Sequence, residues 1–173
     1  MNKPSPSLLT ARLTLRILIV INWILGILIF FLLTISFLAA EWTWQALGVT
    51  KIASPSPIVA GMRAIMVIGI VGTPVAYIVL SRLLRIVESV RAGEPFAMEN
   101  VQRLRTIAWA LLGLELLHLC VVAIASAIST KEVPLRMDSN FDLTGWLAIL
   151  LLFVLAQVFL EGLRMREDLE GTV

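Results

Sequence analysis

The chain has 173 residues, of which 59% are hydrophobic and 15% are charged, whereas soluble domains average about 45–50% and about 25%. A mean hydropathy of +0.94 excludes an ordinary water-soluble fold, and the polar segments are too short for a catalytic domain. The net charge of +2 at pH 7 is too small to predict direct nucleic-acid binding.

Four apolar blocks follow one another along the chain, over residues 17–40, 58–80, 107–128 and 143–160. Each block is close to the length of about 20 residues that a helix needs to cross a bilayer. The first block is too long for the core of a signal peptide and is predicted to be a retained helix. The sequence therefore predicts one transmembrane domain over residues 1–173, an all-α integral membrane four-helix bundle.

Basic residues gather at one end of these predicted helices. They are Lys3, Arg12, Arg16, Arg82, Arg85, Arg91, Arg103, Arg105, Arg164 and Arg166. The connections at the opposite end carry Lys51, Lys131 and Arg136. The positive-inside rule therefore predicts an N-in/C-in topology, with both termini and the middle loop in the cytoplasm.

The first two blocks carry polar or helix-breaking residues within the bilayer. Asn22 is expected to make a hydrogen bond to another helix. Arg63 lies inside the second block and is expected to reach outward to Glu41 or Asp142. Pro74 removes a backbone donor, so a bend in the second helix is expected.

The loop between the second and third blocks keeps a helical rhythm. Its apolar stripe consists of Leu80, Leu83, Leu84, Val87 and Val90. Gly93 suits a left-handed C-cap, and a new helix is expected to start around residues 96–99. Helices two and three are thus predicted to extend together into the cytoplasm as an antiparallel hairpin, residues 82–105. Its arginines could serve either to fix helix ends at lipid phosphates or to bind a partner.

Two ionisable residues lie in the third block. Glu115 and His118 are three residues apart and so share one helix face. They could form a neutral hydrogen-bonded pair inside the bundle or belong to a proton pathway. The lone His118 and the lone Cys120 offer no metal-ligand spacing and no intramolecular disulfide, so no metal or cofactor is expected.

The segment Arg91-Ala-Gly-Glu-Pro-Phe96 is followed by Asn100, Val101, Arg103, Leu104 and Arg105. Together they resemble the G-x-P-F…N…L-R element of the domain-of-unknown-function family 2975. Residues 159–173 are similar to that family's terminal segment. The resemblance implies a multi-pass protein of the bacterial inner membrane, often encoded beside a small helix-turn-helix regulator of the Cro/CI type. It implies no activity, ligand or catalytic residue.

These patterns favour a regulatory or interaction protein that lies in the lipid bilayer and binds a cytoplasmic partner, such as that regulator. The predicted interaction surface comprises Arg82, Arg85, Arg91, Pro95, Phe96, Asn100, Arg103, Arg105 and Asp168. The acidic C-terminal segment is expected to pack on the basic hairpin.

Two alternatives remain open at the level of sequence. One is a homo-oligomeric transporter or channel subunit that uses Arg63, Glu115 and His118. The other is an accessory bundle in a larger membrane complex. No nucleophile set, carboxylate pair or phosphate-binding loop is present in the sequence, so no enzyme is predicted.

Overall fold

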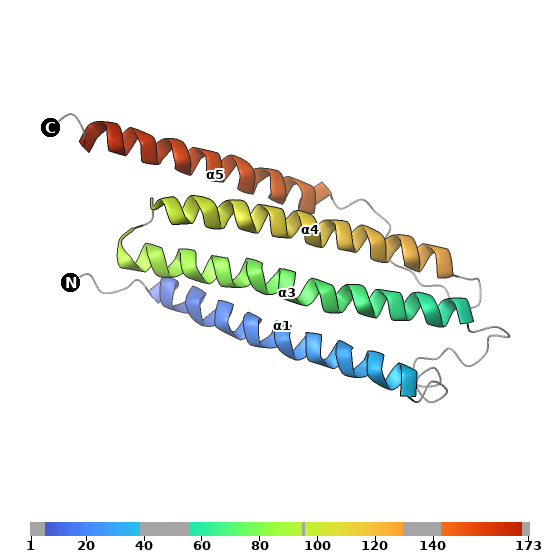
Figure 1. Cartoon of the computed structure of the whole chain (residues 1–173). Helices are drawn as coiled ribbons and strands as arrows, with labels where there is room; N and C mark the ends of the chain where they lie inside the picture. Colours follow the sequence, from blue (N-terminus) through green and yellow to red (C-terminus); the bar gives the residue numbers. More distant parts are fainter. Residues whose placement is uncertain (1–5, 39–55, 95, 130–142, 171–173) are drawn as a thin grey trace.

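The computed structural model describes residues 6–38, 56–94, 96–129 and 143–170, and it is all-α in these ranges. Its helices are α1 (Pro6–Leu38), α3 (Ser56–Ala92), α4 (Met98–Ile128) and α5 (Leu143–Glu170) (Figure 1). Every predicted apolar block is helical where it is described. Helix α1 begins well before its block, because the preceding residues from Pro6 continue the same helix.

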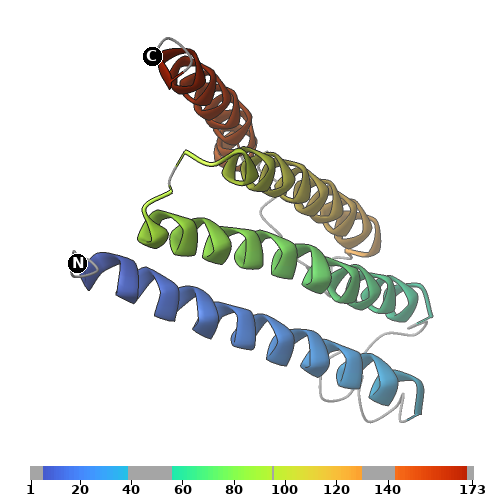
Figure 2. The same ribbon diagram turned by 60° about the vertical axis from the view of Figure 1, so that its left-hand side comes forward.

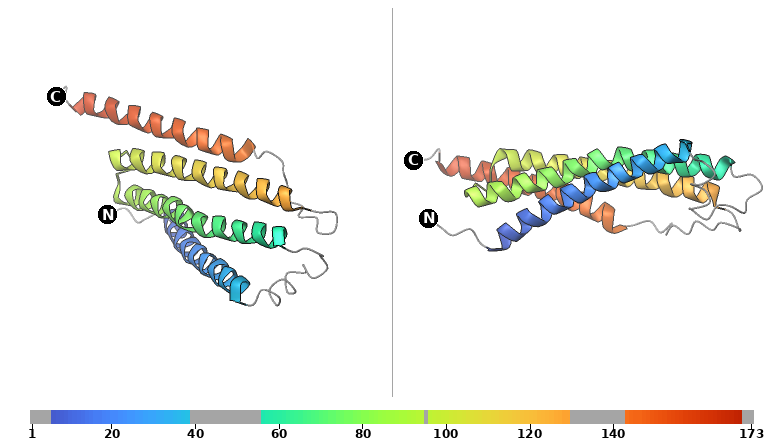
Figure 3. Two further views of the ribbon diagram at one scale, coloured as in Figure 1. Left: turned by 45° about the vertical axis from the view of Figure 1, so that its right-hand side comes forward. Right: turned by 90° about the horizontal axis from the view of Figure 1, so that it is seen from below.

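The helices run alternately up and down and form an open bundle. Extensive contacts in the described ranges join α1 to α3, α3 to α4 and α4 to α5. The helices therefore follow one another in a row, with α1 and α5 at its two edges (Figures 1 and 2). The row is twisted, since α1 crosses α3 obliquely when it is seen from below (Figure 3). The start of α1, the turn from α3 to α4 and the end of α5 lie together at one end.

All four helices are long and apolar enough to cross a membrane. Their outward faces expose large hydrophobic side chains, such as Leu28 and Phe31 on α1 and Leu150 and Leu151 on α5. Such continuous apolar exposure is unfavourable in water and ordinary in hydrocarbon. Length, composition and exposed surface therefore agree on a multi-pass membrane protein.

Two glycines let neighbouring helices approach closely. A Cβ atom on Gly26 of α1 would lie 2.6 Å from Cγ2 of Thr73 on α3, and one on Gly61 of α3 would lie 2.6 Å from Cγ2 of Ile128 on α4. Both distances are shorter than real Cβ contacts, so an alanine at either position would force the facing side chain to move. Close approach of this kind is a main source of helix association in lipid.

Polar contacts fasten α1 to α3 along its length. Nδ2 of Asn22 donates a hydrogen bond to the carbonyl oxygen of Thr73 at 3.1 Å, which confirms the interhelical role expected of Asn22. Near the start of α1, Nε of Arg12 lies 3.2 Å from Oε1 of Glu88 on α3. Helix α3 continues through Pro74. The row is thus held by specific polar and close contacts as well as by apolar packing.

We predict that the substitution Gly26→Ala lowers the free energy of unfolding by about 1–3 kcal/mol, because the new Cβ would overlap Thr73. Gly113→Ala is the matched control, since a Cβ there meets no heavy atom within 4 Å. That control should be neutral or slightly stabilising. Unfolding of both variants by SDS titration from mixed micelles measures the difference. Equal stability of the two variants would contradict the close α1–α3 contact.

Candidate functional site

The turn between α3 and α4 begins with a Schellman motif. Gly93 has a φ of +87°, the left-handed region that favours glycine. Its amide donates to the carbonyl of Val90 at 3.2 Å, and the amide of Glu94 donates to the carbonyl of Ser89 at 3.1 Å. The C-cap expected at Gly93 is therefore confirmed, and α3 ends where the sequence predicts.

Asn100 occupies the centre of this turn and is only 1% exposed. Its Nδ2 donates to Oγ of Ser89 at 2.7 Å and to the carbonyl of Glu94 at 3.3 Å. Its Oδ1 accepts a hydrogen bond from Arg103 at 2.7 Å, and Oγ of Ser89 donates to the carbonyl of Glu94 at 2.6 Å. One buried amide thus connects the end of α3, the turn and the first turns of α4.

An aromatic pair attaches α5 to the same turn. The rings of Phe96 and Phe159 have centroids 5.3 Å apart. Leu163, one turn further along α5, is buried. Residues 91–105 and 159–173, which carry the two motifs of the sequence, therefore meet in the described part of the structure. The side chain of Asp168 and the whole of Pro95 lie outside the described residues.

The arginines of the predicted interaction surface differ in their surroundings. Arg103 is bonded to the buried Asn100, whereas Arg82 and Arg91 are half-buried. Arg85 and Arg105 are exposed. The structure therefore separates one arginine that stabilises the turn from two that extend from the surface at this end of the molecule.

Arg63 is engaged at the opposite end of the molecule. Its Nε donates to Oγ of Ser36 at 2.9 Å, and a second guanidinium nitrogen donates to the carbonyl oxygen of Ser36. The guanidinium carbon lies 4.0 Å from the centre of the Phe37 ring. A cation that binds carbonyl oxygens in the last turn of a helix is favoured by the helix dipole. The expected acidic partners, Glu41 and Asp142, lie outside the described residues.

Glu115 and His118 lie further along the membrane span. Glu115 is half-buried and His118 is exposed, and no hydrogen bond or ion pair joins them within the described ranges. The depth of Arg63 relative to His118 follows from its neighbour Gly61, two residues earlier on α3, which contacts Ile128 of α4. Ile128 lies ~15 Å along α4 from His118, at 1.5 Å per residue. The three predicted intramembrane residues are therefore not brought together in one chain.

Ser36, Ser89 and Glu88 are structural partners that the sequence did not single out. An antiparallel pairing of the first two spans places the end of one beside the start of the next, so Ser36 could have been matched to Arg63 by depth. Ser89 and Glu88 carried no such signal, because their partners depend on the rotation of α3 about its axis.

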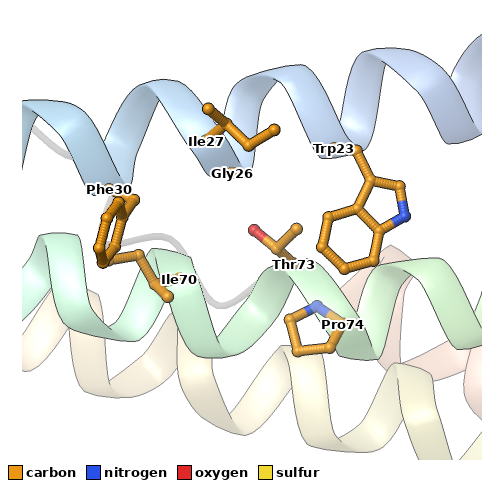
Figure 4. A pocket seen from close by; sticks show the side chains of 7 residues that line it. All are labelled: Trp23, Gly26, Ile27, Phe30, Ile70, Thr73 and Pro74. Carbon is orange, nitrogen blue, oxygen red and sulfur yellow. The ribbon is translucent and has the colours of Figure 1, made fainter.

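An apolar pocket of about 350 Å³ lies between α1 and α3 near Pro74. Figure 4 shows Trp23, Phe30 and Ile70 around it, with Thr73 projecting from α3. The hydroxyl of Thr73 donates to the carbonyl of Gly69 at 3.1 Å. The hydroxyl that faces this pocket is thus already satisfied within α3.

The family model described as "Protein of unknown function (DUF2975)" matches residues 14–173, which is nearly the whole chain. This match confirms the resemblance inferred from the two motif segments. No curated protein and no solved structure matches the chain.

We predict that Asn100→Leu lowers the free energy of unfolding by about 1–3 kcal/mol, because Arg103, Ser89 and the Glu94 carbonyl lose a buried partner. Gln102→Leu, at an exposed position two residues away, is the control and should be close to neutral. Hydrogen exchange should show faster exchange at the amides of Gly93 and Glu94 in the first variant alone. Unchanged exchange there would contradict the role given to Asn100.

We predict that Arg63→Met destabilises the α1–α3 contact by about 1–3 kcal/mol, because the carbonyl and hydroxyl of Ser36 lose their donor. Arg63→Lys retains the charge but has no planar fork, so its loss should be smaller. Unfolding of both variants by SDS titration gives the order of their stabilities. Equal stability of Arg63→Met and the unaltered chain would show that the Ser36 contact contributes nothing.

Proposed function

This chain belongs to the DUF2975 family, and we propose that it is a regulatory or interaction protein that binds a soluble partner at the end formed by the α3–α4 turn. The observation that carries the proposal is the combination of a fixed backbone and an exposed apolar and cationic surface at this end. The proposed partner is a cytoplasmic helix-turn-helix transcription regulator, which follows from the family resemblance.

The exposed residues in and beside the α3–α4 turn include Arg85, Val90, Phe96, Met98 and Arg105, and we assign the proposed surface to them. Phe96 is 51% exposed although one side of its ring packs on Phe159. Aromatic residues, Met and Arg are enriched in protein interfaces relative to the rest of a protein surface. This composition supports protein recognition at the turn.

The network around Asn100 supports the same proposal. A surface whose backbone is already fixed loses little conformational entropy when a partner binds. Three sets of contacts restrict the conformation of the turn: the Schellman motif at Gly93, the hydrogen bonds of Asn100 and the contact between Phe96 and Phe159. The turn is therefore organised before a partner arrives.

The inner-membrane location and the N-in/C-in orientation are part of this proposal. Described arginines at the turn end include Arg12, Arg16, Arg82 and Arg85, and this excess of positive charge favours the cytoplasmic side. A partner that is soluble in the cytoplasm would then meet the turn directly.

A transporter or channel is less well supported. That alternative would place Arg63, Glu115 and His118 along one path, yet Arg63 is bound to Ser36 at the far end of the span. Two pockets within the described span, one near Pro74 and one beside His118, are lined almost entirely by apolar side chains. The arrangement therefore favours partner binding over a polar route through the protein.

We predict that the full-length chain in detergent retains a small helix-turn-helix regulator of the Cro/CI type, the partner that the family resemblance implies, and that the double variant Arg85→Gln/Arg105→Gln reduces retention at least about tenfold. The matched control, Arg85→Lys/Arg105→Lys, preserves the charge and should keep most of the binding. Co-purification measured at two salt concentrations should show weaker binding at high salt. Lack of retention by the unaltered chain, or equal retention by all three proteins, would retire the proposal.

A further inference from the structure

A second cavity, of about 370 Å³ and open on one side, lies within the membrane span over α3, between residues of α1 and α4. Its walls include Ile29 of α1, Gly69 and Gly72 of α3, and Leu114 of α4. His118 of α4 is the one polar side chain among the residues that line it. The volume falls in the range of small-molecule sites, which are mostly apolar with few polar groups.

The glycines in the wall of this cavity are not explained by helix packing. At Gly26 and Gly61 an added Cβ would lie 2.6 Å from a neighbouring side-chain atom, so close packing favours glycine there. At Gly69 and Gly72 the nearest atoms would be 3.4 Å and 3.8 Å away, distances at which alanine fits. A glycine inside a helix costs about 0.5–1 kcal/mol relative to alanine. Gly69 and Gly72 instead leave the space that forms the cavity.

The imidazole of His118 lacks a partner in the described part of the chain. Its side chain is exposed and is among those that line the cavity, and it lies near the middle of the apolar block 107–128. An imidazole carries at least one N–H donor, and a polar group left without a hydrogen bond in hydrocarbon is costly. A molecule that occupies the cavity and accepts a hydrogen bond would remove that cost.

We propose that this cavity binds an uncharged, lipid-soluble molecule that has a carbonyl or hydroxyl group within its apolar skeleton, with His118 as the hydrogen-bond partner. The ester groups of phospholipids stay near the bilayer surface, so their chains would bring only methylene groups to this depth. A charged ligand is disfavoured, because no opposite charge lines the cavity. This site is independent of the partner proposed for the α3–α4 turn.

The single histidine of the chain makes the test direct, since ¹⁵N-histidine labelling reports on His118 alone. The full-length protein in phosphatidylcholine nanodiscs is titrated with dipentyl ketone, which has a central carbonyl, and with undecane, the hydrocarbon of the same chain length. The ketone should shift the imidazole nitrogen signals in a saturable way, and undecane should not.

Two variants locate the response. Gly72→Val fills the cavity and should weaken the apparent affinity for the ketone at least about tenfold. Gly113→Val places the same side chain on α4 where no heavy atom lies within 4 Å and outside the cavity wall, so it should leave the response unchanged.

Three results would overturn the proposal. They are the absence of a saturable shift with the ketone, an equal shift with undecane, and an undiminished shift in Gly72→Val. The comparison of ketone with undecane uses the unaltered chain, so it decides the matter even if Gly72→Val does not fold.

Discussion

The arrangement of this protein depends on how helices associate in hydrocarbon. Lipid tails are as apolar as leucine side chains, so burying apolar surface between helices supplies little net stabilisation in a bilayer. Close approach and polar contacts must hold the helices instead. The structure has both: Gly26 brings α1 onto α3, Arg63 binds Ser36, and Asn100 connects α3 to α4. Arg63 and Asn100 therefore serve to hold neighbouring helices together.

The row of helices determines where function can reside. Each helix packs mainly on its neighbours in sequence, so the described helices enclose no central polar channel. Distinct chemistry remains in two places, the surface around the α3–α4 turn and the cavity that contains His118. The first is the surface proposed to bind a soluble partner, and the second is the cavity proposed to bind a lipid-soluble molecule.

The spans, the cap at Gly93 and the bond of Asn22 could be predicted because each follows from local pattern. Apolar length marks a span, a glycine after the last helical turn marks a cap, and an amide in an apolar block must find a partner. The role of Asn100 could not be predicted. It was assigned to an interaction surface with Arg103, yet it is buried among the groups it bonds. Its position depends on how α3 and α4 are rotated against each other, and the resemblance to a family gave motif positions without their contacts.

The contacts of α1 have a consequence for assembly. Helix α1 precedes α3 in the chain, and its main contacts in the described ranges are with α3. Asn22, Ser36 and Arg12 therefore remain without their α3 partners until that helix has been inserted. In the folded chain these polar groups of α1 are satisfied by Thr73, Arg63 and Glu88 of α3. Because α3 is the next described helix in the chain, the α1–α3 contact can form before α4 and α5 have been added.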